Sequence, residues 1–157
     1  MGRDRLTEKR TKGLLNFSLP RRVLYMDEPI KIECRGRDGY KTAVFVTSLG
    51  GEVELRIDER TARRTRRVFL SPRKSHQVAE VLEDWSSDPF SGESVEFQCE
   101  SSEPSSSYIE TTTMVITPFD SHVELQMGEG PGSRLVYASP AQASKIAAAL
   151  QDATLDL

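Results

Sequence analysis

The densest group of chemically active side chains in this sequence is a run of arginines between two expected strands. The run places five arginines within eight residues: Arg60, Arg63, Arg64, Arg66 and Arg67. A guanidinium group pairs with phosphate oxygens through two parallel hydrogen bonds, so a protruding loop of this composition can hold several phosphates. Two other interpretations stay open, namely a solvated loop and a loop that pairs with acidic residues elsewhere in the chain.

Further cations and one aromatic ring come from neighbouring segments of the sequence. They extend the basic surface into an adjacent turn and into the first turn of an expected helix: Arg35, Arg37, Tyr40, Lys41 and Arg73. Together with Arg63, Arg64, Arg66 and Arg67, these residues form the predicted nucleic-acid-binding set.

Patterns typical of catalytic or metal sites are missing from the sequence. His76 and His122 fall at unrelated places, whereas Cys34 and Cys99 occupy equivalent positions of two expected strands, among inward-facing residues. Buried thiols are therefore the first interpretation, with a disulfide or a metal pair between the two cysteines as the alternative. No phosphate-cradling glycine loop, nucleophile elbow or zinc-type cysteine spacing is present. We expect no enzyme activity, no metal and no cofactor.

The charges are distributed unevenly along the chain. Residues 1–75 carry 19 Lys and Arg against 10 Asp and Glu, a net charge of +9, whereas residues 76–157 carry 2 against 14, a net charge of −12. Such asymmetry indicates a polyanionic partner for the first half, or a charge-complementary contact between the halves. Independent drift of two solvated surfaces is the remaining alternative.

The overall composition favours a soluble globular protein. Of the 157 residues, 37% are hydrophobic and 29% charged, and no stretch approaches the roughly 18–20 apolar residues that cross a bilayer. The basic segment 1–12 precedes only Leu14, Leu15 and Phe17, which is too short an apolar core for a secretion signal. We therefore expect a cytoplasmic protein that does not contact membranes.

Two stretches of the chain, 42–84 and 112–152, match each other in order and spacing. Residues 53–55 and 123–125 both read Val-Glu-Leu and follow a threonine after the same gap. Ser-Pro dipeptides at 71–72 and 139–140 are followed by Ala, Leu and Asp at matching offsets. Two ordered blocks, each preceded by a cysteine, indicate duplication of a unit of about 60 residues.

Each unit is predicted to contain four strands and a helix. Apolar residues alternate over 30–35 and 53–58, the run 42–47 is apolar throughout, and 67–70 leads into a Ser-Pro dipeptide. Serine caps a helix and proline fits its first position, so helices are expected after Ser71 and Ser139.

We therefore predict an α+β fold in which two tandem ββββα repeats pack as one pseudo-two-fold domain, with antiparallel sheets and one helix each. The expected divisions are a basic N-terminal arm over 1–28, a basic repeat over 29–87 and an acidic repeat over 94–157.

This duplicated pattern resembles the fold shared by Whirly proteins, Pur-alpha repeats and the kinetoplastid guide-RNA-binding proteins. The segments Arg67–Pro72 and Leu135–Pro140, each running into an amphipathic helix, are similar to the last strand and helix of Whirly units. The resemblance covers residues of about 29–155 and implies single-stranded DNA or RNA binding across the sheets, without fixing the residues.

The sequence thus predicts a protein that binds nucleic acid, preferably single-stranded, through its arginine-rich first half. Exposed aromatic candidates are few, so salt-sensitive backbone contacts should dominate. The outward residues of the second half should repel phosphate: Glu96, Gln98, Glu100, His122, Glu124 and Gln126. The alternative function is a protein-interaction or regulatory module, whose basic and acidic halves bind a protein partner or self-associate.

Overall fold

In the part of the chain that the structure describes, alternating apolar and polar residues produce eight strands, and the order along the chain is four strands and a helix, twice. This computed structural model describes residues 28–37, 39–59, 65–89, 92–102 and 109–155. The first strands and helix are β2 (Ile30–Gly36), β3 (Lys41–Leu49), β4 (Glu52–Glu59), β5 (Thr65–Leu70) and α1 (Pro72–Ser87). The second set is β6 (Val95–Ser102), β7 (Glu110–Pro118), β8 (Val123–Met127), β9 (Arg134–Ala138) and α2 (Pro140–Leu155), with a short 3₁₀ turn, η2 (Gly130–Gly132), before β9.

Both helices begin where the Ser-Pro dipeptides predicted. The Ser71 hydroxyl accepts a hydrogen bond from the Lys74 backbone N–H at 3.2 Å. At the start of α2, the Ser139 hydroxyl accepts from the Gln142 N–H at 3.2 Å, and the Gln142 side-chain oxygen accepts from the Ser139 N–H at 2.9 Å. This reciprocal arrangement is a capping box, and it fixes both the start of α2 and the orientation of the Gln142 side chain.

The predicted fold class is wrong, because the strands do not form two separate sheets with one helix each. All eight strands form one closed antiparallel barrel in the order β2-β3-β4-β5-β6-β7-β8-β9. Two joints close it: β5 pairs with β6, with Phe69 opposite Glu100, and β9 pairs with β2, with Tyr137 opposite Arg35. The joints are short, with two register pairs between β2 and β9 and three between β5 and β6, so closure pairs only part of the strand edges that two separate sheets would have exposed.

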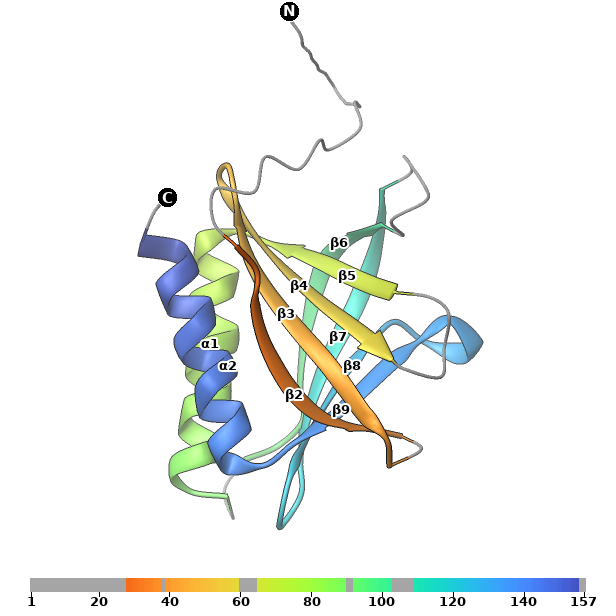
Figure 1. The fold of residues 1–157 in the computed structure, drawn as a ribbon, viewed down its shortest axis with the longest axis vertical. Coiled ribbons are helices and arrows are strands. Elements are labelled where there is room, and N and C mark those ends of the chain that lie inside the picture. Colours follow the sequence, from red (N-terminus) through yellow and green to blue (C-terminus); the bar gives the residue numbers. More distant parts are fainter. Residues whose placement is uncertain (1–27, 38, 60–64, 90–91, 103–108, 156–157) are drawn as a thin grey trace, which may run out of the picture.

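The helices pack against each other on one side of the barrel, as Figure 1 shows. The Ser75 hydroxyl of α1 donates to the Leu150 carbonyl of α2 at 3.2 Å. Apolar side chains of both helices join those of the barrel interior in a single core cluster, with Leu82, Trp85, Ile146 and Leu150 almost fully buried. The predicted repeats, 29–87 and 94–157, therefore share one barrel and one core, and residues 1–27 of the predicted arm over 1–28 lie outside the described residues.

None of the helices in the described part of the chain is long and apolar enough to cross a membrane.

Candidate functional site

The joint between β2 and β9 carries two adjoining pockets on the outside of the barrel. One has a volume of about 570 Å³ and is lined by Arg35, Phe119, Ser121, His122, Glu124, Tyr137, Ser139 and Gln142. The other, of about 520 Å³, is lined by Glu33, Cys34, Arg35, Gly39, Tyr40, Lys41 and Gln142. Because Arg35 and Gln142 line both, we treat the two pockets as one feature and refer to it as the seam groove.

Strand register places the side chains of the seam groove in a row. Arg35 on β2 lies opposite Tyr137 on β9, and Tyr137 lies opposite Glu124 on β8. Successive residues of a strand point to opposite faces, and the neighbours Cys34, Val136 and Leu125 point into the core. Arg35, Tyr137 and Glu124 therefore share the outer face of three adjacent strands.

Three aromatic rings that line the groove contact one another: Phe119 and His122 of the β7–β8 turn and Tyr137 of β9. The ring of His122 stacks on Phe119 with centroids 4.9 Å apart and an interplanar angle of 24°. The same His122 ring meets Tyr137 edge-on, again at 4.9 Å. The Phe119 N–H donates to the His122 carbonyl at 2.9 Å, which holds the turn, and Phe119 is 43% exposed. One aromatic face is thus presented to solvent on a fixed support.

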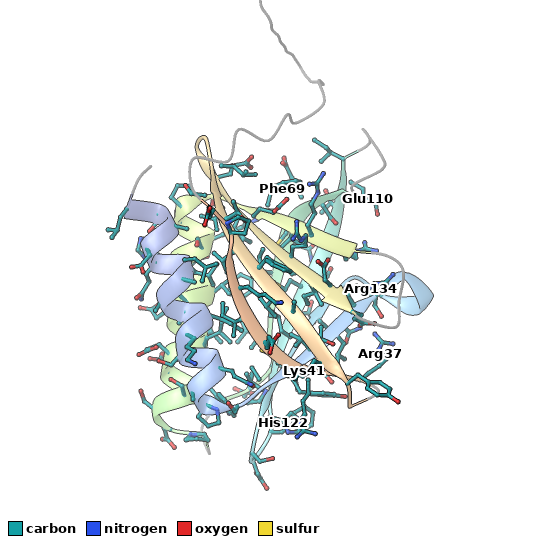
Figure 2. The ribbon with its side chains drawn as sticks, viewed as in Figure 1. Arg37, Lys41, Phe69, Glu110, His122 and Arg134 are labelled. Atoms are coloured by element: carbon teal, nitrogen blue, oxygen red, sulfur yellow. The ribbon has the colours of Figure 1, made fainter. Side chains whose placement is uncertain are left out.

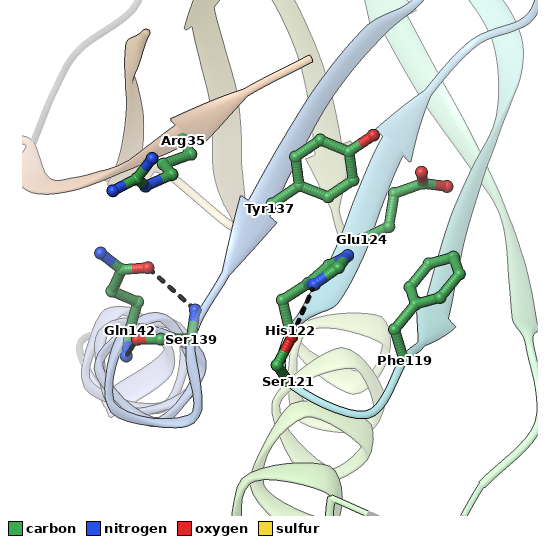
Figure 3. Close-up of a pocket in the computed structure, with 8 residues that line it drawn as sticks. All are labelled: Arg35, Phe119, Ser121, His122, Glu124, Tyr137, Ser139 and Gln142. Atoms are coloured by element: carbon green, nitrogen blue, oxygen red, sulfur yellow. Dashed lines mark hydrogen bonds between the residues drawn. The ribbon is translucent and has the colours of Figure 1, made fainter. Parts of the chain in front are cut away.

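Arg35 is the cation of the groove that is free to bind a ligand. It is exposed and makes no hydrogen bond or ion pair within the described residues, and Figure 3 shows it beside Tyr137 and across from Gln142. Lys41 lies 3.7 Å from the Glu33 carboxylate in an exposed pair, an arrangement that contributes little energy and leaves the ammonium accessible. Tyr40, 59% exposed, lies at the far end of the same groove.

Arg37, another predicted binding residue, connects segments of the barrel to one another. Its guanidinium donates to the Ser133 hydroxyl at 3.1 Å and lies 3.8 Å from the Glu59 carboxylate. Glu59 also accepts from the Leu135 backbone N–H at 2.9 Å.

Figure 2 shows Arg37, Lys41 and His122 in the lower part of the molecule, and Phe69 and Glu110 in the upper part.

Arg66 and Arg67, from the predicted arginine loop, are also bonded internally. Arg66 donates to the Gly132 carbonyl at 3.1 Å and to the Thr112 hydroxyl at 3.2 Å, and pairs with Glu110 at 3.7 Å. Arg67 donates to the fully buried Glu54 carboxylate at 3.0 Å. Arg66 therefore joins the basic half to the acidic half, the internal pairing that the sequence had left open.

Of the remaining predicted residues, Arg73 lines neither pocket. Arg73 is exposed in the first turn of α1, without a hydrogen bond or ion pair to any described residue. Arg63 and Arg64 lie outside the described residues. The binding role of the full predicted set stays a prediction, and of its described members the structure brings Arg35, Tyr40 and Lys41 together in the groove.

Sequence reasoning missed the aromatic part of the groove. His122 and Glu124 were placed on the outer face of the second half, but only as part of a surface that repels phosphate. Phe119 and Tyr137 received no role. The alternation around Tyr137 was a usable signal that its ring points outward, but only the β2–β9 pairing brings it next to Arg35.

The two cysteines are buried thiols. Both are free and almost inaccessible to solvent. Burial raises the pKa of Cys34 to about 12 and that of Cys99 to about 11. Both groups are therefore neutral thiols at neutral pH, and a neutral thiol is a poor nucleophile and a poor metal ligand. Among the described residues, no three His, Cys, Asp or Glu side chains gather as a metal site would require.

Comparisons with known proteins identify no relative of this chain. No protein-family model, no curated protein and no solved structure matches the chain. The resemblance to Whirly and Pur-alpha proteins therefore stays a prediction.

Proposed function

We propose that the seam groove binds single-stranded nucleic acid. The observation that carries the proposal is that an exposed Arg35 side chain, with no hydrogen bond or ion pair to a described residue, lines the same pocket as the stacked rings of Phe119 and His122. An accessible aromatic face stacks on an unpaired base and contributes about 1–3 kcal/mol per base, while a guanidinium holds the adjoining phosphate through two hydrogen bonds.

The groove favours a single strand over a duplex. The faces of paired bases are covered by their neighbours, so only an unpaired base can slide onto the exposed side of Phe119. Tyr40 offers a second exposed ring in the adjoining pocket, which Arg35 and Lys41 also line. An open groove that carries exposed rings and cations offers contacts to both the bases and the phosphates of a strand.

Fluorescence anisotropy with labelled oligonucleotides of about 12 nucleotides tests the proposal, because this length covers the usual site sizes of single-strand-binding domains. Single-stranded dT and rU oligomers and a duplex control are titrated at about 50 and 200 mM salt. We expect micromolar binding to the single strands, weakened by salt, and weaker binding to the duplex. Absence of binding to any oligomer at low salt overturns the proposal.

Matched variants locate the binding surface. Arg35→Ala should lower the slope of log K against log salt by about 0.7, the value of one phosphate contact on a single strand. Phe119→Ala should weaken binding about tenfold through the lost stacking. Arg73→Ala removes an equally exposed arginine that lines neither pocket, so it should leave binding nearly unchanged. Equal effects of Arg35→Ala and Arg73→Ala contradict a site in the seam groove.

A second candidate function is docking of a basic protein or of a second copy of the chain. The acidic second half favours it, because exposed carboxylates lie on β6, on β7 and before η2: Glu96, Glu100, Glu110 and Glu129. Light scattering at the same two salt concentrations tests whether the chain associates with a second copy of itself. A mass above the monomer that falls with added salt supports it, whereas a monomer under both conditions contradicts it.

A further inference from the structure

Glu124 is an unexplained carboxylate within the seam groove. It is half-buried, lines the same pocket as Phe119, His122 and Tyr137, and has no hydrogen bond or ion pair to any described residue. An ionised carboxylate only accepts hydrogen bonds. Placed where a phosphate-binding surface should avoid negative charge, it points to a ligand that presents donors at this spot.

Glu124 and Arg35 lie at opposite ends of one row. Figure 3 shows Arg35 on one side of Tyr137 and the Glu124 carboxylate on the other, near Phe119. The row spans three adjacent strands, so the two backbone positions are about 10 Å apart, or two strand spacings. A nucleotide also has its phosphate at one end and the hydrogen-bonding edge of its base at the other. With the phosphate on Arg35 and the base over the rings, that edge faces Glu124.

The donor pattern of the bases decides which base fits. Guanine presents two adjacent donors, N1–H and the N2 amino group, which match the two oxygens of a carboxylate. Adenine and cytosine present one amino group beside a ring nitrogen that accepts, so a carboxylate meets one donor and one repelling lone pair. Thymine and uracil present one N–H between two carbonyl oxygens. Guanine is therefore the base that satisfies Glu124.

We propose that Glu124 makes this end of the seam groove selective for guanine. The inference rests on the proposed function and adds base selectivity to it. Arg35 then holds the phosphate, the Phe119–His122 stack supports the base, and Glu124 reads its edge.

A host–guest series measures the selectivity. Each oligomer is a thymidine strand of about 12 nucleotides with one central guest base, which is guanine, hypoxanthine, adenine or cytosine. Only one guanine is used because several would form a quadruplex. We expect the guanine guest to bind about tenfold tighter than the adenine guest, the scale of one bidentate base contact. Hypoxanthine lacks the N2 amino group and keeps N1–H, so it should fall between them. Equal affinity for the four guests overturns the inference while leaving the proposed function standing.

The variant Glu124→Gln tests the carboxylate itself. A glutamine side chain presents an amide N–H donor beside a carbonyl acceptor, a pattern that pairs with adenine, with cytosine and with the N1–H and O6 of guanine. We therefore expect the preference for guanine to be lost. Glu129→Gln makes the same change of charge at an exposed residue outside both pockets and should keep the guanine preference. Uniformly tighter binding of all guests to Glu124→Gln contradicts the inference, because it shows charge repulsion alone.

Titration with GMP and AMP separates a strand from a free nucleotide. If no oligomer binds, but GMP binds more tightly than AMP and Glu124→Gln removes this difference, the proposed function is overturned and the role of Glu124 is supported. Absence of binding by every oligomer and both nucleotides overturns both. Thermal unfolding of each variant, within a few degrees of the wild type, shows that the groove is intact.

Discussion

Whether an arginine of this protein can contact a ligand depends on the partners that surround it. The Arg35 side chain points outward beside Tyr137 and pairs with no carboxylate in the described part of the chain, whereas Arg66 and Arg67 are bonded within the barrel wall. A guanidinium already satisfied by a buried carboxylate gains little from a phosphate, because that contact first breaks the existing pair. The density of arginine over 60–67 therefore serves, in its described part, to hold strands together.

The pair of Glu54 and Arg67 yields a stability prediction. Glu54 is fully buried on the outer side of β4, and only one of its carboxylate oxygens has a hydrogen-bond partner, the one that accepts from Arg67. Arg67→Ala leaves that carboxylate buried without its cation and should lower the free energy of unfolding by about 3 kcal/mol. Urea denaturation measures the loss.

The double variant Glu54→Leu with Arg67→Leu is the control for this prediction. Removing both charges and filling the space with apolar side chains should return stability to within about 1 kcal/mol of the wild type. A double variant as unstable as Arg67→Ala would show that packing of the Arg67 side chain, rather than the ion pair, accounts for the loss.

At the scale of elements, the turn between β8 and η2 is fixed by Arg66, which belongs to β5 in the first half of the chain. Gly128 has a φ of +81°, and its N–H donates to the Thr113 carbonyl at 2.9 Å. The Arg66 guanidinium packs over it so closely that a Cβ at this position would lie 2.8 Å from Arg66 Cζ. The glycine is needed both for its backbone conformation and for the approach of the arginine.

Two alanine substitutions separate these two requirements. Gly130→Ala meets open space at a φ of +70°, so it should cost only the left-handed strain of about 1 kcal/mol. Gly128→Ala adds the contact with Arg66 and should cost at least about 2 kcal/mol in urea denaturation. Equal costs would mean that the Arg66 side chain moves aside without loss, and that its bonds to Gly132 and Thr112 contribute little.

At the scale of the whole molecule, barrel closure makes the two halves one folding unit. Each half supplies one strand to each joint, and the apolar faces of α1 and α2 belong to the same core. A half on its own would expose two strand edges and part of its core, at a size where burial barely offsets the loss of chain entropy.

Unfolding should therefore occur in one step, seen identically by a probe in each half. Trp85 of α1 is the sole tryptophan and reports on the first half by fluorescence. Cys99 of β6 reports on the second half through its reaction with a thiol reagent. With a pKa of about 11, it is ionised to only about one part in a thousand at pH 8, so labelling requires unfolding.

Coincident midpoints in urea, with the Cys34→Ser variant used to isolate Cys99, are the expected result. Separate midpoints would contradict a single cooperative unit and would indicate that the halves unfold independently.

The elements and the burial of their apolar residues follow from the sequence by itself, whereas the full burial of Glu54 does not. Period-two alternation around Ile32 and Leu55 marks strands, and the Ser-Pro dipeptides at 71–72 and 139–140 mark both helix starts, because these signals depend on neighbouring residues. The pairing of β2 with β9 and of β5 with β6 was decided only by tertiary structure. A strand edge carries backbone groups alone, so no side-chain pattern names its partner, and the seam groove exists only once Arg35 lies beside Tyr137.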